Sequence, residues 1–273
     1  MQTVRCAFLG LAALAAGLPA AAQDGEATRQ LAEAASTCAP QAFACNLGDR
    51  PARFEPGDCR SSNGRAFDLY SFGAQAGEMI TVSLGSQRFG GYVALVNPQG
   101  RIVETAEVPT PGEKAFVSFA APEDGMYDVI ASTAAPGAEG DYQVSVACLE
   151  VPAPRFTPCT GDDDLCLGAG RFRVETWWQT PDGHTGRGTP SAVSDDTGWF
   201  SFFRPGTAEV MVKALDGCEV NGHNWVFAAG LTDVHTAIRV TDTLAQETVW
   251  YFNPHRTPFR AVQDTTALDT CGG

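Results

Sequence analysis

The eight cysteines that follow residue 22 are the residues of this chain with the most defined chemistry. They divide four and four along the chain, as Cys38, Cys45, Cys59 and Cys148, then Cys159, Cys166, Cys218 and Cys271. An even count behind an export signal predicts disulfides. We favour the pairs Cys38–Cys45, Cys59–Cys148, Cys159–Cys166 and Cys218–Cys271, while other pairings within each half stay open. Zinc is disfavoured, because the Cys-x6-Cys spacing does not fit a zinc knuckle and zinc thiolates are unusual in exported proteins.

A run of three carboxylates, Asp162, Asp163 and Asp164, lies inside the loop that the Cys159–Cys166 bridge would close. Carboxylate oxygens in a tight loop are ligands that Ca²⁺ accepts. The run lacks the spacing of an EF-hand loop, and adjacent acids more often form a solvated loop. No cofactor is therefore expected, and a calcium-stabilised extracellular structural protein stays as an alternative.

Histidines could supply acid–base chemistry, and the chain has four of them: His184, His223, His235 and His255. None belongs to an H-E-x-x-H motif, and no G-x-S-x-G nucleophile elbow is present. A triad assembled from scattered Ser, His and Asp residues would carry no weight. We therefore expect a protein that is not an enzyme.

All five tryptophans fall in the second half of the chain, at Trp177, Trp178, Trp199, Trp225 and Trp250. Exposed aromatic rings can stack on sugars, so a carbohydrate-binding protein is an alternative. In an expected strand over residues 171–178, Trp178 shares a face with Phe172 and Val174, which predicts a core position for Trp178 and an exposed ring at Trp177. Similarly, Trp199 and Phe203 oppose Phe200, so one of those faces points outward or is covered by a domain.

The N-terminal segment has the pattern of a secretory signal peptide over residues 1–22. Arg5 precedes an apolar run, and Ala20, Ala21 and Ala22 provide a small-residue cleavage site. The apolar run is too short to span a bilayer, and no later segment is apolar enough to be transmembrane. We therefore expect a secreted or periplasmic protein that does not insert into the membrane after signal cleavage.

The charge of the chain limits its partners. The whole sequence has a formal net charge of −14, and removing Arg5 with the signal makes it −15. Such an acidic protein is not expected to bind nucleic acid or anionic membrane surfaces. The partner class that remains is an unknown extracellular protein or polysaccharide.

Short β-branched or alternating runs, separated by Gly, Pro, Asn and Asp, must position these residues. In the first half they predict strands at 66–72, 78–84, 91–97, 101–106, 115–119, 126–132 and 141–148. In the second half they predict strands at 171–178, 188–194, 198–204, 208–214, 223–229, 234–241 and 247–252. The fold class is therefore all-β, with two antiparallel β-sandwich-like domains in tandem.

The expected domain boundaries follow from changes in this pattern. Residues 23–58 form a lead-in with a short helix and a disulfide clip, and residues 59–148 form the first sandwich. Residues 149–158 hold three prolines and predict a semi-rigid linker. Residues 159–273 form the second β domain, whose tail after residue 253 has little regularity.

Residues 59–148 carry an ordered set of short motifs: Asp68-x-Tyr70-x-Phe72, Leu95-x-Asn97-Pro98-x-Gly100, Pro122-x-Asp124-Gly125-x-Tyr127 and Gly140-x-Tyr142-x-Val144-x-Val146. This set resembles the bacterial pre-peptidase C-terminal domain, a small β-sandwich found beside catalytic domains in secreted proteins. The resemblance implies an accessory role in secretion, substrate targeting or maturation. This chain departs from the usual context, because no peptidase domain accompanies the segment.

Residues 165–271 are similar to a recurrent secreted bacterial β module of unknown function, through the segments at 171–174, 195–203, 212–218 and 251–254. That similarity implies no activity. Taken with the signal, the cysteines and the missing catalytic motifs, it leads us to expect a secreted, non-catalytic accessory protein that is adhesive or targets a substrate.

Overall fold

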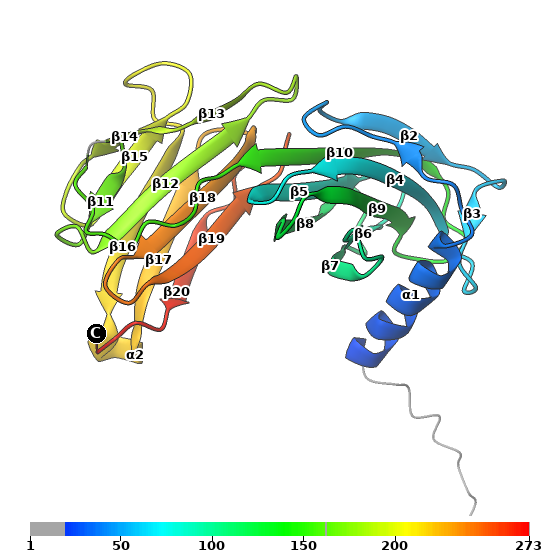
Figure 1. Cartoon of the computed structure of the whole chain (residues 1–273), viewed down its shortest axis with the longest axis horizontal. Helices are drawn as coiled ribbons and strands as arrows, with labels where there is room; N and C mark the ends of the chain where they lie inside the picture. The colour runs from blue at the N-terminus through cyan, green and yellow to red at the C-terminus, as the bar shows by residue number, and fades with distance from the viewer. Residues whose placement is uncertain (1–19, 162, 273) are drawn as a thin grey trace, which may run out of the picture.

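The computed structural model describes residues 20–161 and 163–272. The predicted signal peptide lies outside the described residues as far as residue 19, and so does Asp162 of the acidic run. The described chain is all-β, as predicted, and forms two largely antiparallel sandwiches, each with its own core (Figure 1). Among the described residues, no helix is long and apolar enough to cross a membrane.

The first sandwich consists of a sheet with strand order β1-β4-β9-β6-β7, in which β3 also pairs with β4, and a sheet with order β2-β10-β5-β8. The strands are β1 (Gln41–Ala42), β2 (Arg50–Phe54), β3 (Cys59–Arg60), β4 (Ala66–Ala74), β5 (Glu78–Gly85), β6 (Gly91–Val96), β7 (Ile102–Glu107), β8 (Lys114–Ala120), β9 (Gly125–Thr133) and β10 (Gly140–Glu150). Alternate residues such as Phe72, Val82 and Val129 point between the sheets and are fully buried.

The first sandwich begins earlier than residue 59. β2, which the sequence placed inside the lead-in, pairs antiparallel with β10, with Phe54 opposite Gly140. The sequence of β2 contains Pro51, which lowers its strand signal. Because β2 lies at the edge of its sheet, a residue without a backbone N–H is tolerated there.

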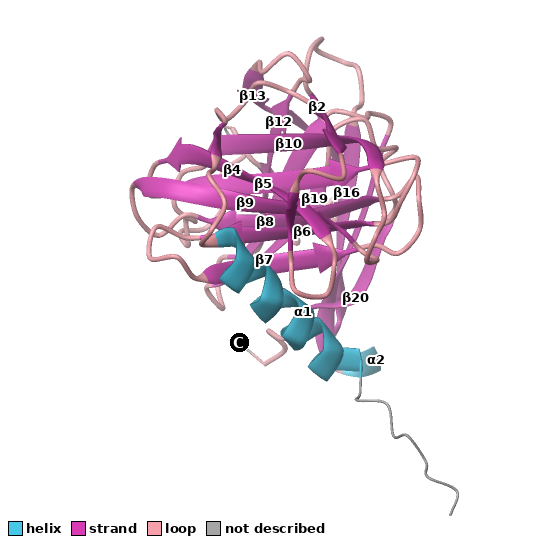
Figure 2. Ribbon diagram, turned by 90° about the vertical axis from the view of Figure 1, so that its right-hand side faces the viewer, coloured by secondary structure: helices cyan, strands magenta, loops and turns pink. Residues whose placement is uncertain are grey.

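The N-terminal helix α1 (Ala20–Ala35) covers the outer face of the first sheet (Figure 2). Leu31 is fully buried, against Phe67, Leu69 and Tyr92. The Thr28 hydroxyl lies 2.9 Å from the Tyr92 hydroxyl. The short helix expected in this stretch is therefore an integral part of the first domain.

Two of the favoured disulfides in the first half are wrong, because Cys38 pairs with Cys59 and Cys45 pairs with Cys148. Cys38 follows α1 and stays on the outer face of the first sheet, where β3 carries Cys59. Cys45 lies beyond β1 and reaches the opposite sheet, where the Asn46 amide donates to the Val146 carbonyl. The path of the lead-in therefore brings Cys38 to Cys59 and Cys45 to Cys148, instead of the pairs that sequence spacing favoured. In the second half, the bonds are Cys159–Cys166 and Cys218–Cys271, as expected.

The second sandwich consists of a sheet with order β11-β12-β18-β19, in which β13 also pairs with β12, and a sheet with order β14-β15-β16-β17-β20. Its elements are β11 (Leu165–Leu167), β12 (Phe172–Gln179), β13 (Thr185–Arg187), β14 (Thr189–Ala192), β15 (Thr197–Ser201), β16 (Val210–Gly217), α2 (Cys218–Asn221), β17 (His223–Gly230), β18 (His235–Asp242), β19 (Glu247–Asn253) and β20 (Val262–Leu268). The tail is more regular than expected, since β20 pairs with β17 beside the Cys218–Cys271 bond.

The two sandwiches contact each other directly and meet at an angle (Figure 1). Met79 and Leu149 of the first domain pack against Trp177 and Ala237 of the second. Gly48, at φ +76°, lies so close to the second domain that a Cβ atom would be 1.8 Å from the Pro181 carbonyl oxygen. These contacts hold the two domains in a defined arrangement.

Candidate functional site

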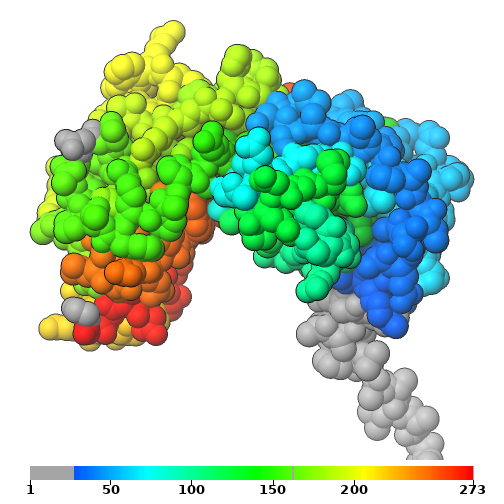
Figure 3. Space-filling view, viewed as in Figure 1, coloured from blue at the N-terminus to red at the C-terminus, as the bar shows by residue number. Residues whose placement is uncertain are grey.

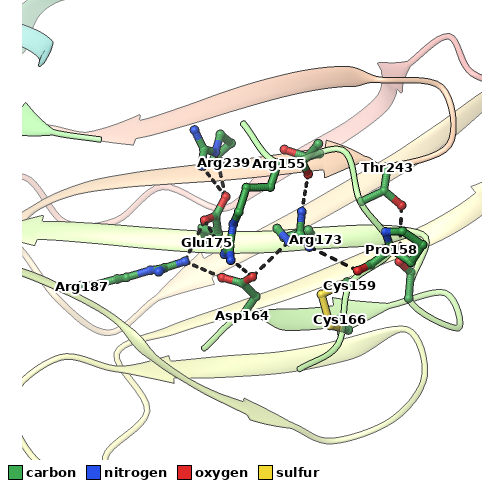
Figure 4. Close-up of polar contacts among 12 residues, drawn as sticks. Arg155, Pro158, Cys159, Asp164, Cys166, Arg173, Glu175, Arg187, Arg239 and Thr243 are labelled. Carbon is green, nitrogen blue, oxygen red and sulfur yellow. Dashed lines mark hydrogen bonds and ion pairs between the residues drawn. A yellow bond between two sulfur atoms is a disulfide. The ribbon is translucent and has the colours of Figure 1, made fainter. Parts of the chain in front are cut away.

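A cluster of arginines and carboxylates lies on the outer face of β12 and β18, under the interdomain linker (Figure 4). We call it the arginine cluster, and its members are Arg155, Asp164, Arg173, Glu175, Arg187 and Arg239. Glu175 is fully buried, and its Oε2 accepts from Arg239 Nε at 2.8 Å and Nη2 at 2.6 Å. Its Oε1 accepts from Arg187 at 2.7 Å. The carboxylate is thus clamped between two guanidinium groups.

The same arginines hold the backbone of the proline-rich linker. Arg239 donates to the Pro152 carbonyl at 2.6 Å. Arg173 donates to the Arg155 carbonyl and, at 3.4 Å, to the Pro158 carbonyl. A proline-rich segment makes no hydrogen bonds of its own along its backbone, so its carbonyls need outside donors. The arginine cluster supplies those donors and fixes the linker against the second domain.

Trp177, predicted to be an exposed ligand platform, is buried at 5% exposure, and that prediction is wrong. Arg239 lies 4.9 Å over its ring, and Trp250 packs beside it at 5.7 Å between centroids. Strand alternation correctly separated Trp177 from the core face of Phe172 and Val174. It could not show that the linker and the first domain cover the opposite face.

The acidic run does not act as one site among the described residues. Asp163 is exposed, whereas Asp164 is 6% exposed and bonded to Arg155, Arg173 and Arg187. A carboxylate surrounded by three guanidinium groups is poorly suited to hold Ca²⁺, because the arginines already neutralise it and repel a cation. Asp164 is therefore excluded as a calcium ligand.

In the second domain, the outward face of the sheet β14-β15-β16-β17-β20 is rich in aromatic and apolar side chains. We call it the aromatic face, and its members are Trp199, Met211, Leu215, Trp225 and Phe227. They come from β15, β16 and β17, whose other side chains fill the core. Trp199 lies opposite Met211, and Leu215 lies opposite Trp225. All five are at least partly exposed, and Met211 reaches 47%.

The Trp225 ring has a fixed position on this face. Its Nε1 donates to the Asn221 side-chain oxygen at 2.8 Å, and the ring lies over Gly217. A Cβ atom at Gly217 would come within 2.2 Å of the indole, so glycine is required for the ring to lie there. Phe227 packs edge-on beside it, at 6.4 Å between centroids. A held indole on a sheet surface offers an apolar plane with little conformational freedom left to lose on binding.

Polar groups border the aromatic face. Lys213, on the same side of β16, lies 3.4 Å from Asp196. Hydrogen bonds from the Thr197 and Ser194 hydroxyls lower the pKa of Asp196 to about 2, so its carboxylate is ionised at any ordinary pH. These groups can donate to and accept from hydroxyl groups of a ligand.

Trp199 and Trp225 were not selected as site residues from the sequence. A usable signal existed: within 223–229, Trp225 and Phe227 alternate with Val226 and Ala228, which marks two different faces. The alternation could not tell which of those faces meets the other sheet.

Two of the four histidines, His235 and His255, lie side by side in a buried position. His235 Nδ1 contacts the Asn253 carbonyl at 3.1 Å, and His255 Nε2 contacts Gln179 at 2.8 Å. Burial lowers the pKa of His235 to about 3 and that of His255 to about 4. Both imidazoles are therefore neutral near pH 7. His184 lies in an exposed loop.

Comparisons with known proteins add a structural likeness. No protein-family model and no curated protein sequence matches this chain. The pre-peptidase C-terminal domain of collagenase from Bacillus anthracis aligns with 40% of this chain and 97% of its own length, at 18% identity and a TM-score of 0.31. Bacillus licheniformis lipase BlEst2 in propeptide form aligns with 83% of this chain, at 13% identity and a TM-score of 0.26. This chain spans 43% of the length of that lipase. The first likeness is consistent with the resemblance noted for residues 59–148, and no activity follows from either likeness.

Proposed function

We propose that this protein is an exported, non-catalytic accessory protein that attaches to a polysaccharide surface through the aromatic face of its second domain. The observation that carries the proposal is that Trp199 and Trp225 lie on the same outward sheet face, with the Trp225 ring held by Asn221. Aromatic rings bury much apolar area and combine it with a polar edge, which suits the faces and hydroxyls of sugars.

Because the aromatic face is an open sheet surface, it favours an insoluble polysaccharide over a soluble oligosaccharide. The aromatic side chains project from three adjacent strands of one sheet rather than from the walls of a cleft. An extended solid surface can contact such a face along several chains, whereas a short soluble oligosaccharide would bury little of it. We therefore expect binding to insoluble polysaccharide and weak binding to its soluble fragments.

Export and the accessory role rest on separate observations. Four disulfides join the described cysteines, and such bonds persist in oxidising compartments. Within residues 20–161 and 163–272, the hydrogen-bond partners of the buried, neutral His235 and His255 include no carboxylate or nucleophile, which fits the proposed non-catalytic role.

A depletion assay with the mature protein tests the proposal. The protein is mixed with microcrystalline cellulose and, separately, with chitin, and the unbound fraction is measured. We expect saturable binding to at least one solid, with affinity at least tenfold lower in Trp225→Ala, because a central anchor residue is commonly worth 2 kcal/mol or more. The matched control is Phe203→Ala, which removes a 49% exposed ring outside the aromatic face. Equal binding by the wild type and Trp225→Ala, or no binding to either solid, would overturn the proposal.

A further inference from the structure

The cleft between the two domains has the features of a small-molecule site. It lies between the two sandwiches, which meet at an angle (Figure 3). Its cavity of about 360 Å³ takes side chains from β8 of the first domain and from β19, β20 and the loop between them in the second. Clefts of a few hundred Å³ at domain interfaces are preferred ligand sites. The cleft is separate from the aromatic face.

The walls of the cleft are largely apolar. Phe116, 38% exposed, contributes from the first domain, and Phe252, Phe259 and Val262 contribute from the second. The Phe259 ring lies against Gly230, where a Cβ atom would come within 2.6 Å of it. The ring is thus placed by close packing, and the cleft keeps an apolar surface open to solvent between the domains.

Lys114 supplies a cation next to these rings. Its Nζ donates to the His255 carbonyl across the domain interface. An ammonium group has three donors, and this carbonyl takes one of them. Burial lowers the pKa of Lys114, and the nearby carboxylates of Asp49 and Asp233 act in the opposite direction. A further anion beside the ammonium group would favour its charged form.

The rim of the cleft carries further positive charge. Arg260 is 82% exposed and lies 3.8 Å from the half-exposed Glu113, a contact that contributes little to stability. Arg256, in the adjoining part of the cleft, is paired with Asp49. The charged side chains that line this cleft are two cations, Lys114 and Arg260, and one carboxylate, Glu113, in a chain whose overall charge is −14. Outside the lining, Arg256 and the carboxylates of Asp49 and Asp233 also act on Lys114. The local excess of positive charge favours an anionic ligand.

We propose that this interdomain cleft binds a small carboxylate with an alkyl chain, its carboxylate facing Lys114 and Arg260 and its chain lying against Phe116, Phe252 and Phe259. The chemistry is that of a medium-chain fatty acid. The apolar walls supply affinity through buried area, and the cations supply selectivity for the carboxylate over a neutral or cationic head.

Isothermal titration calorimetry with sodium decanoate, on the mature two-domain protein, tests this assignment. Decyltrimethylammonium, which has the same chain length and the opposite charge, is the ligand control, and both are used below their micelle concentrations. We expect saturable one-to-one binding of decanoate and at least tenfold weaker binding of the cation. Comparable binding of both compounds would show detergent-like association and overturn the proposal.

The chain offers a matched control for the lysine, because it has only two lysines, Lys114 and Lys213. Lys114→Met should weaken decanoate binding at least tenfold, whereas Lys213→Met should leave it unchanged. If Lys114→Met unfolds, as seen by circular dichroism, Arg260→Met tests the same point at an exposed position, with an expected loss of severalfold. Unchanged decanoate affinity in a folded Lys114→Met or in Arg260→Met would overturn the proposal.

Lysine labelling of the wild-type protein gives a second readout. Acetic anhydride modifies both lysines, and mass spectrometry follows each one separately. Decanoate should protect Lys114 and leave the rate at Lys213 unchanged. Equal acetylation of Lys114 with and without saturating decanoate would place the ligand elsewhere. Failure of cellulose and chitin binding would leave all of these results unaffected, because they concern the other site.

Discussion

Replacing Glu175 by Gln tests whether the arginine cluster stabilises the second domain and holds the linker against it. Glu175 is fully buried and accepts from Arg239 and Arg187, while Arg155 lies within 3.4 Å. Glutamine keeps nearly the same shape, so the substitution removes the negative charge without opening a cavity. It leaves Arg239, itself 1% exposed, without a charged partner.

The expected cost follows from the desolvation of Arg239. Removing one partner of a buried ion pair costs about 3–5 kcal/mol, because the other charge stays buried and uncompensated. For a chain of this size, each kcal/mol lowers the melting temperature by about 2–4 °C, which gives a decrease of about 6–20 °C. Differential scanning calorimetry of the mature protein measures it. The matched control is Asp141→Asn, which breaks an exposed pair with Arg53 and should cost less than about 1 kcal/mol.

A second measurement separates the role of the cluster in holding the linker from its role within the sheet. Arg239 also binds the Pro152 carbonyl, so its displacement should expose residues 152–158 to proteases. Limited proteolysis should cut Glu175→Gln in this segment faster than the wild type. A melting temperature within about 2 °C of the wild type would refute the stabilising role of the cluster. A large decrease with unchanged proteolysis would refute its role in holding the linker.

Acid should destabilise the protein, because the pKa values of His235 and His255 are lowered to about 3 and about 4 in the folded state, below the unfolded value near 6.5. The unfolded chain then binds more protons than the folded protein as the pH drops below about 6.5. The free energy of unfolding should therefore decrease by about 1.4 kcal/mol per pH unit for each histidine. Urea titrations between pH 4.5 and 8 measure this decrease, and a flat profile would contradict the burial of these rings. Replacing Cys45 and Cys148 by serine should lower the free energy of unfolding by about 4–5 kcal/mol, because their bond closes a loop of 103 residues. Replacing Cys159 and Cys166 by serine should lower it by about 2 kcal/mol less, because that bond closes a loop of only seven residues. Urea unfolding of the two double variants compares them, and equal losses would argue against loop entropy as the source.

Most strands could be predicted from the sequence, because a local pattern decides them. The runs around Ile80 and Val144 alternate apolar and polar residues, and Gly, Pro, Asn and Asp residues mark the turns between such runs. β2 and β20 were not predicted, and the reason again lies in their local sequence. β2 contains a proline, and β20 (Val262–Leu268) has mostly polar side chains because it is an edge strand with little buried surface.

The site residues divide in the same way. The sequence by itself determined that Trp177 and Val174 lie on opposite faces of β12, and it indicated that the cysteines of each half form disulfides within that half. Only the tertiary structure decided that the linker covers Trp177, that Asp164 meets three arginines and that Cys45 bonds to Cys148. Alternation is a property of one strand and is set by neighbouring residues. Which face is covered, and which cysteines meet, depends on how segments distant in the chain pack together, and no local pattern records that.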